Sequence, residues 1–383
     1  MKIRKSNFRC QRGKFSIRGR QYIPEGEKLP IVIASHEFIM GSFTTRRYAR
    51  RFAQWGYAAF CYDFVGGTIL GGSGGKHTDM TVFTEMQDLK AVIAYARSLP
   101  ETDSERVYLM GCSQGGLVSA LLAAQLGDEI KGLMLFYPAF SIPDDARAGN
   151  MIFNTDFDPR DIPEIIKCGP LTFSGRYAAS LLLMDVFEEI ADYKGPVFIA
   201  HGKKDGIVDY GYSVRAQEAY SKARCSLLTL PKGKHVFLPL QDRPAVSGMK
   251  HFLEGRREVL EVDVKLTAIM PRFKGLHNWL TIPFTGHAGG DLFEGDILAG
   301  AQDVQERRGF KTVRLCADYT MEGTDFTGEK CRIQVQNLDT GAGWKPTLYT
   351  DSAALSALND TECFAFVQQR GLRGPLVRIF AKL

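Results

Sequence analysis

The stretch LMGCSQGGLVSA, residues 109–120, combines the features of a strand, a sharp turn and a helix. The apolar run before Gly111 is typical of a buried strand, and the small and apolar residues after Gly115 are typical of a helix packed on a sheet. Ser113 stands between them in a G-x-S-x-G pattern. Such a turn strains the serine backbone and exposes its hydroxyl, and only small residues fit two positions to either side. The stretch therefore predicts a serine nucleophile where a strand meets a helix.

Short apolar runs alternate with amphipathic segments on both sides of this turn. IVIASH at residues 31–36 is typical of a buried strand, residues 44–56 have helical spacing, and YAAFCYDF at residues 57–64 is again strand-like. The basic segment over residues 1–20 alternates as a two-stranded hairpin would. This alternation of strand-like and helix-like segments predicts an α/β domain over residues 1–255, with a mostly parallel sheet covered by helices on both faces.

The alternation of strand-like and helix-like segments is interrupted in two regions, and these regions define the domain organisation. Residues 138–190 mix acidic, aromatic and Pro residues in an order that suits neither strand nor helix for long, so we interpret them as an insertion over the sheet. From VLEVDVKLTA onward the apolar period is two, with Leu260, Val262, Val264 and Leu266 on one face. Further strand-like runs separated by Gly and Asp predict an all-β, barrel-like domain over residues 256–383.

Composition narrows the functional classes. The 383 residues are 45% hydrophobic and 24% charged, with a formal net charge of +5 that does not imply nucleic-acid binding. No apolar run reaches the roughly 18 residues of a membrane span, and the N-terminus lacks the apolar core of a secretory signal. The eight Cys form no C-x-x-C pair, so we expect reduced thiols and no metal site. We therefore expect a cytoplasmic protein without membrane or nucleic-acid partners.

A serine nucleophile needs a base and an acid that orients it. In the chain order of this turn type the acid and then the His follow the serine. Asp205 comes just after the strand-like run PVFIAHG, and His235 follows the next one, CSLLTL. Both lie at carboxyl ends of predicted strands, where open α/β sheets place their sites. We predict a Ser113–Asp205–His235 triad. Asp209 is the competing acid, although its position suits the cap of a following helix.

The oxyanion of a tetrahedral intermediate needs two backbone N–H donors. One comes from the residue after the nucleophile, here Gln114, and the other from the loop after the first buried strand. In the SHEF loop at His36 this donor is the amide of Phe38. We expect structural roles for His201 and His251, and a buried, unreactive thiol at Cys112.

Residues 30–255 resemble the α/β-hydrolase superfamily, and specifically its bacterial cinnamoyl (feruloyl) esterases. The insertion, with YPAFSIPDDARAGNMIFNTDFDPRDIPE and LTFSGRYAASL, looks like the small lid of that family. The resemblance implies an α/β-hydrolase fold with a lid, and a cofactor-free serine esterase that releases ferulate, caffeate or coumarate. The other matching stretches are SHEF, FAQWGYAAFCYDF, MTVFTEMQDLKAVI, YLMGCSQGG, AHGKKDGIVD and GKHVF.

The same resemblance implies two substrate-binding residues in the lid. A lid Asp and a lid Tyr of the family hold the phenolic hydroxyl, and they correspond to Asp145 and Tyr177, with Asp144 as the neighbouring alternative. A carboxylate accepts a strong, charge-assisted hydrogen bond from a phenol. The chain departs from the family at Glu37, where Gly is usual. A carboxylate pointing at the oxyanion would oppose catalysis, so we expect Glu37 to point outward.

The C-terminal region resembles a family of small bacterial β-barrel domains of unassigned function. We interpret it as an accessory domain for oligomerisation, which leaves a homodimer open, or for binding a saccharide or an aromatic group. The main hypothesis is an esterase acting on a small phenolic ester. One alternative is an acetyl or short-chain esterase, or a serine peptidase, with the same triad. The other is a catalytically weak hydrolase fold whose C-terminal domain does the binding.

Overall fold

The computed structural model describes residues 2–69, 71–152, 155–168, 171–221, 225–238, 241–274, 277–308, 311–339 and 343–382. The chain divides into two compact units, Met1–Val246 and Ser247–Leu383. The division falls inside helix α8 (Arg243–Leu253), whereas the sequence placed it after residue 255. The end of α8 packs with the second unit because the ring of His251 stacks on Phe380 at a centroid distance of 4.3 Å.

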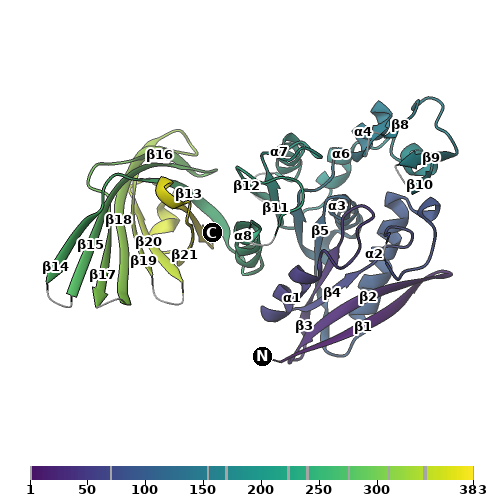
Figure 1. Ribbon diagram of the computed structural model, residues 1–383, viewed down its shortest axis with the longest axis horizontal. Coiled ribbons are helices and arrows are strands. Elements are labelled where there is room, and N and C mark those ends of the chain that lie inside the picture. Colours follow the sequence, from purple (N-terminus) through teal and green to yellow (C-terminus); the bar gives the residue numbers. More distant parts are fainter. Residues whose placement is uncertain are drawn as a thin grey trace. The chain divides into compact units, whose positions relative to one another are not determined.

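An eight-stranded mixed sheet forms the centre of the first unit (Figure 1). The two N-terminal strands are antiparallel, and the six others are parallel to one another. The predicted hairpin and the predicted mostly parallel sheet are therefore confirmed. In spatial order the strands are β1 (Ile3–Arg12), β2 (Phe15–Pro24), β4 (Ala58–Tyr62), β3 (Leu29–Ser35), β5 (Thr102–Cys112), β6 (Ile130–Phe136), β11 (Val197–Gly202) and β12 (Cys225–Leu230).

Helices cover both faces of this sheet. On one face, Leu133 and Leu135 of β6 join the core that includes the buried residues of α2 (Val82–Arg97) and α3 (Gln114–Leu126). Because side chains alternate along a strand, the next residue, Phe136, points to the other face. There it packs on Tyr48 of α1 (Arg46–Gln54) at 5.2 Å.

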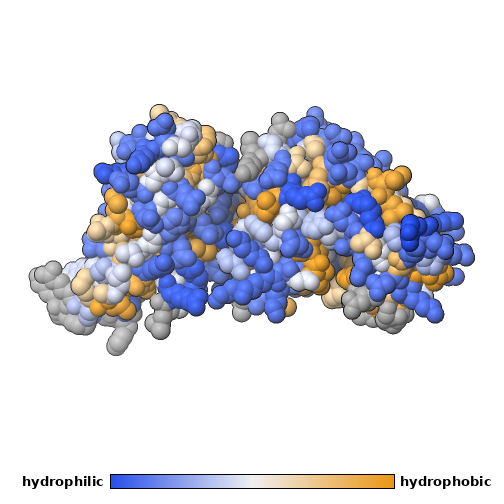
Figure 2. All heavy atoms as spheres, turned by 90° about the horizontal axis from the view of Figure 1, so that it is seen from above, coloured by the Kyte–Doolittle hydropathy of each residue, from blue (hydrophilic) through white to orange (hydrophobic). Residues whose placement is uncertain are grey.

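The described helices include none that is long and apolar enough to cross a membrane. Hydrophilic residues cover much of the face shown in Figure 2, and apolar residues lie between them in separate patches.

The predicted insertion consists of short elements gathered on one side of the unit (Figure 1). Its described strands pair with each other in two small antiparallel ladders, β7 with β8 and β9 with β10. Residues 153, 154, 169 and 170 of the insertion lie outside the described residues. The elements are α4 (Ile142–Ala148), β7 (Asn150–Met151), β8 (Thr155–Asp156), β9 (Ile165–Cys168), β10 (Leu171–Ser174), α5 (Arg176–Ala179) and α6 (Val186–Ala191). Helix α7 (Gly211–Ala219) follows β11 in the main domain.

The second unit is the all-β domain expected from the period of two. Its strands form a closed ring, because β13 pairs with β22 on one side and with β15 on the other. Val262 and Val264 point into its core as predicted, whereas Leu266 at the end of β13 is 37% exposed. The strands are β13 (Arg257–Leu266), β14 (Met270–Lys274), β15 (His277–Gly289), β16 (Phe293–Ile297), β17 (Gln302–Arg308), β18 (Lys311–Asp325), β19 (Lys330–Asp339), β20 (Trp344–Thr350), β21 (Cys363–Gln368) and β22 (Leu376–Ala381).

Candidate active site

Ser113 occupies the turn between β5 and α3 with φ of 51° and ψ of −120°, a conformation that non-glycine residues rarely adopt. The two glycines of the motif make this turn sterically feasible. A Cβ at Gly111 would lie 2.1 Å from the carbonyl oxygen of Gly115, and one at Gly115 would lie 2.4 Å from that of His36. The strand, the helix and the packed turn therefore hold the Ser113 side chain at the carboxyl end of β5.

Ser113, His235 and Asp205 come together from three loops at strand ends. Nε2 of His235 lies 2.9 Å from Oγ of Ser113, and Nδ1 lies 2.7 Å from Oδ2 of Asp205. The other carboxylate oxygen of Asp205 accepts from the amides of Ile207 and Val208 at 2.9 and 3.0 Å. Burial opposes ionisation of Asp205, but hydrogen bonds from histidines and amides outweigh it and hold its pKa well below the usual value. The arrangement can transfer the hydroxyl proton of Ser113 to His235.

The loop after β3 carries the expected oxyanion donor. His36 is fully buried, and burial lowers its pKa, so the ring is neutral. Its Nε2 accepts from the amide of Phe64 at 3.2 Å, and its Nδ1 lies 2.6 Å from the carbonyl oxygen of Glu37 and 3.2 Å from the amide of Gly41. These bonds fasten the peptide that precedes Phe38. In the described part of the chain, the amides of Phe38 and Gln114 have no hydrogen-bond acceptor, so both are available to an oxyanion.

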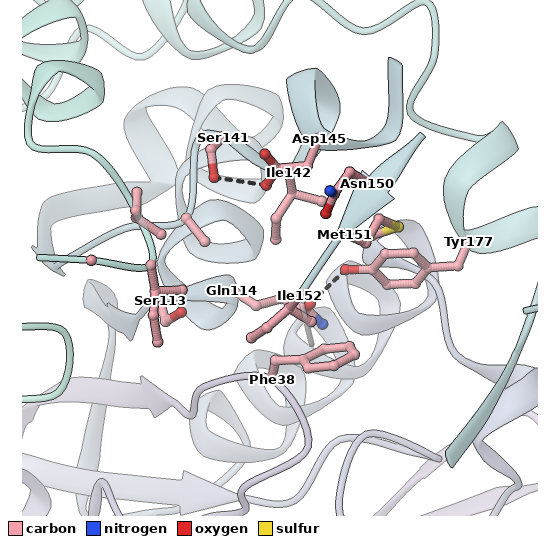
Figure 3. A pocket seen from close by; sticks show the side chains of 14 residues that line it. Phe38, Ser113, Gln114, Ser141, Ile142, Asp145, Asn150, Met151, Ile152 and Tyr177 are labelled. Atoms are coloured by element: carbon pink, nitrogen blue, oxygen red, sulfur yellow. Dashed lines mark hydrogen bonds between the residues drawn. The ribbon is translucent and has the colours of Figure 1, made fainter. Parts of the chain in front are cut away.

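A pocket of about 310 Å³ begins at Ser113 and extends beneath the lid (Figure 3). In this view Ser113 lies on the left and Tyr177 on the right, and Asp145 lies above them beside Ser141. Apolar and polar side chains both line the walls between them. The lining residues are Phe38, Ser113, Gln114, Ala139, Ser141, Ile142, Asp145, Asn150, Met151, Ile152, Tyr177, Gly206, Ile207 and Val208.

Of the two adjacent acids in α4, Asp145 is the one that lines the pocket. Its Oδ2 accepts from the hydroxyl of Ser141 at 2.9 Å, and burial raises its pKa. Asp144 instead accepts from the hydroxyl of Tyr212 at 2.7 Å and pairs with Arg147. The structure thus brings Asp145, rather than Asp144, into the same cavity as Ser113.

The hydrolase-like unit of this chain is similar to several known proteins. The profile of a hydrolase family described as serine aminopeptidase, S33, matches residues 26–155. The solved structure of Est1E from Butyrivibrio proteoclasticus with ferulic acid bound has a TM-score of 0.59 and 28% sequence identity, and covers 64% of this chain and 98% of its own. The first unit has the α/β-hydrolase fold. The Pyrococcus furiosus esterase Pf2001 shares the fold at 21% identity and a TM-score of 0.51, covering 66% of this chain and 92% of its own.

A curated relative matches a shorter part of the hydrolase. The quorum-quenching protein AidA of Acinetobacter baumannii (strain MDR-ZJ06) is 36% identical over 93 residues. The match spans 23% of this chain and 28% of the length of AidA.

Glu37 avoids the pocket, as expected of a residue that points away from the oxyanion, but it is buried in the protein rather than directed to solvent. The side chain is buried, and its carboxylate accepts from the hydroxyls of Thr44 at 2.6 Å and Tyr137 at 2.9 Å. These two hydroxyls hold it inside the hydrolase core, because a buried carboxylate needs hydrogen-bond donors. Glu37 is absent from the described residues that line the pocket. The ring of Tyr137 packs edge-on against His235 at 4.9 Å, so Tyr137 links Glu37 to the histidine of the site.

Sequence reasoning missed two residues that contact the site. His201, expected to be structural, hydrogen-bonds Oδ2 of Asp205 at 3.0 Å; its signal was its place four residues before the acid, on the same strand end. Glu85 of α2 accepts from the side chain of Gln114 at 2.6 Å, and nothing in its local sequence distinguishes it from a surface acid of a helix. Cys112 is buried, and burial raises its pKa well above the usual value, as expected for an inert thiol. Asp209 accepts from the amide of Gly211 at 2.7 Å at the start of α7.

Proposed function

We propose that this protein is a serine carboxylic ester hydrolase that releases hydroxycinnamates from plant-derived esters through an acyl-enzyme. The observation that carries the proposal is the pocket, in which Ser113, Asp145 and Tyr177 line one cavity. A substrate held there needs an apolar acyl group, an ester carbonyl at one end and a hydrogen-bond donor at the other. Hydroxycinnamates have this order of groups.

The triad supplies the proposed chemistry. Oγ of Ser113 attacks the ester carbonyl carbon while His235 takes the hydroxyl proton, and Asp205 keeps the imidazole in the required tautomer. The tetrahedral oxyanion accepts from the amides of Phe38 and Gln114. His235 then protonates the alcohol as it leaves. Water, deprotonated by His235, attacks the acyl-enzyme and releases the free acid.

The walls and the far end of the pocket support a phenolic acyl group. Phe38, Ile142 and Ile152 offer apolar surface on which a cinnamoyl ring and its double bond can pack. The carboxylate of Asp145 can accept from the phenolic hydroxyl. The likeness to Est1E, whose structure holds ferulic acid, agrees with this assignment.

The first test is hydrolysis of methyl ferulate by the purified protein, beside 4-nitrophenyl acetate and with Ser113→Ala as the control. Ferulate release that the variant loses supports both the triad and the substrate class. Acetate hydrolysis without ferulate release would leave a general esterase and remove the phenolic pocket from the proposal. Methyl caffeate and methyl coumarate then rank the acyl groups.

The matched family profile gives one further candidate, a serine aminopeptidase. Such an enzyme needs an anion for the ammonium group of its substrate, and Asp145 is the acidic residue among the described residues that line the pocket. Leucine 4-nitroanilide belongs in the same assay. Its cleavage at a rate above that of methyl ferulate would favour the peptidase.

A further inference from the structure

Three buried side chains connect helix α2 to the substrate pocket. Nε2 of Gln114 donates to Oε2 of Glu85 at 2.6 Å, and the hydroxyl of Tyr177 donates to Oε1 of Gln114, also at 2.6 Å (Figure 3 draws the second bond). Glu85 and Gln114 are each 1% exposed, and Tyr177 is 3% exposed. Water is therefore a poor substitute for any of these partners, and the three groups form one hydrogen-bonded relay.

The amide of Gln114 gives this relay its direction, with its NH₂ group facing Oε2 of Glu85 and its carbonyl oxygen facing Tyr177. Burial raises the pKa of Glu85 well above its usual value and so favours the protonated carboxyl group. In this arrangement the proton of Glu85 lies on Oε1, and Oε2 accepts from Gln114. A hydroxyl has one hydrogen, and Tyr177 uses it on Gln114. Burial and the nearby carboxyls raise the pKa of Tyr177 well above its usual value, so the hydroxyl keeps this hydrogen.

The Tyr177 oxygen can therefore accept a hydrogen bond from a group in the pocket, but it has no hydrogen left to donate to that group. Asp145, when ionised, is also an acceptor without a hydrogen. Both groups line the same pocket, and two acceptors there suit a substrate that brings its own O–H. An ether oxygen at the same place has no hydrogen to donate, and it leaves both groups without a partner at a cost in binding.

We propose that Glu85 is a specificity-determining positioning residue: it orients Gln114 and thereby makes Tyr177 an acceptor, which selects acyl groups with a para-hydroxyl over those with a para-methoxyl. The inference rests on the proposed function, because the para substituent must reach Tyr177. Glu85 itself touches no substrate. Its effect passes through the side chain of Gln114, whose backbone amide is the expected oxyanion donor.

Removal of the Glu85 acceptor should reverse the relay. In Glu85→Met the Gln114 NH₂ group loses its partner, and a flip of the amide lets it donate to the oxygen of Tyr177. The Tyr177 hydroxyl is then free to donate into the pocket. In Glu85→Gln the new amide oxygen can take the place of Oε2, so the original direction is kept.

The experiment compares kcat/KM for methyl 4-hydroxycinnamate and methyl 4-methoxycinnamate in the wild type, Glu85→Gln and Glu85→Met. We expect the wild type to prefer the hydroxyl substrate by about tenfold or more in kcat/KM. This is the effect of one hydrogen bond to a charged or buried partner. We expect Glu85→Gln to keep the preference and Glu85→Met to lose most of it. A hydroxyl preference in Glu85→Met equal to that of the wild type would overturn the inference, as would the same loss in both variants.

A second measurement separates the relay from a general loss of folding. In a Tyr177→Phe background the Tyr177 oxygen is gone, so adding Glu85→Met should leave the hydroxyl-to-methoxyl ratio of that background unchanged. A further change there would mean that Glu85 acts by another route. Hydrolysis of 4-nitrophenyl acetate shows whether each variant retains an assembled triad. If the wild type hydrolyses the acetate but neither cinnamate, the proposed function fails and the inference falls with it; if only the ratio in Glu85→Met stays unchanged, the inference alone fails.

Discussion

His201 and His235 hydrogen-bond the same atom, Oδ2 of Asp205, at 3.0 and 2.7 Å. The carboxylate can only accept, so Nε2 of His201 carries a proton, and its Nδ1 accepts from the hydroxyl of Ser213 at 2.6 Å. His201 is completely buried and lies on β11, next to the edge strand β12 of the sheet. A rigid strand thus holds Asp205 in the plane from which it orients His235.

We expect His201→Leu to lower kcat for any ester by roughly ten- to hundredfold and to leave KM nearly unchanged. The reason is the loss of one hydrogen bond to a buried charge that acts on the proton-transfer step. His201→Gln can keep a donor near Oδ2 of Asp205 and should recover most of the loss. Steady-state kinetics on 4-nitrophenyl acetate measure both variants. An equal loss in the two would assign His201 a purely structural role.

Ser113→Ala and His235→Ala should each lower kcat by about 10⁴ to 10⁶, and the double variant should lose little more. Members of a triad act as a unit, so removal of one removes most of the benefit of the others. Sensitive assays of residual hydrolysis check this expectation. Multiplying losses in the double variant would show that Ser113 and His235 act independently.

The grouping of Ser113, Asp205 and His235 could be predicted because each residue lies in a recognisable local sequence pattern and because the fold brings the three patterns together. Gly111 and Gly115 bracket Ser113 within five consecutive positions, and the flanking strand and helix are periodic. Asp205 and His235 each follow a strand, and the carboxyl ends of parallel strands meet at one edge of a sheet. Topology therefore brings together residues that are far apart in the sequence.

The relations that sequence missed depend on neighbours from distant segments. Nothing near Glu37 shows that the hydroxyl of Tyr137 will meet its carboxylate, and nothing near Glu85 shows that Gln114 will lie against it. In the second unit, β17 has the polar sequence QDVQERR, which lacks the alternation that marks a strand. Its two neighbours, β15 and β18, specify it by backbone pairing.

Asp145→Ala should spare 4-nitrophenyl acetate and weaken methyl ferulate, because only the phenolic substrate uses the carboxylate. Loss of a charge-assisted hydrogen bond predicts a decrease in kcat/KM for ferulate equivalent to about 1 to 3 kcal/mol. The two substrates measured side by side give this difference. An equal decrease for both would remove Asp145 from the proposed phenol site.

The preference for a para-hydroxyl should weaken in acid. Burial raises the pKa of Asp145 above the usual value, so this carboxyl gains its proton at a higher pH than an exposed one. The protonated group has an O–H and accepts less well, which disfavours the phenol and favours a methoxyl. The hydroxyl-to-methoxyl ratio of kcat/KM should therefore decrease as the pH falls through this pKa. In Asp145→Asn the ratio should vary less with pH over the same interval.

Glu37→Gly restores the residue usual in the resembled family, yet we expect it to impair this protein. The change leaves the buried hydroxyl of Tyr137 without its acceptor, and an unpaired buried group costs about 1 to 3 kcal/mol of folding free energy. It also frees the backbone next to Phe38, whose amide is the expected oxyanion donor. Thermal unfolding and acetate hydrolysis should both show a decrease, whereas Glu37→Gln, which keeps an acceptor oxygen, should stay closer to the wild type. A marked rise in activity for Glu37→Gly would show that the carboxylate opposes the developing oxyanion after all.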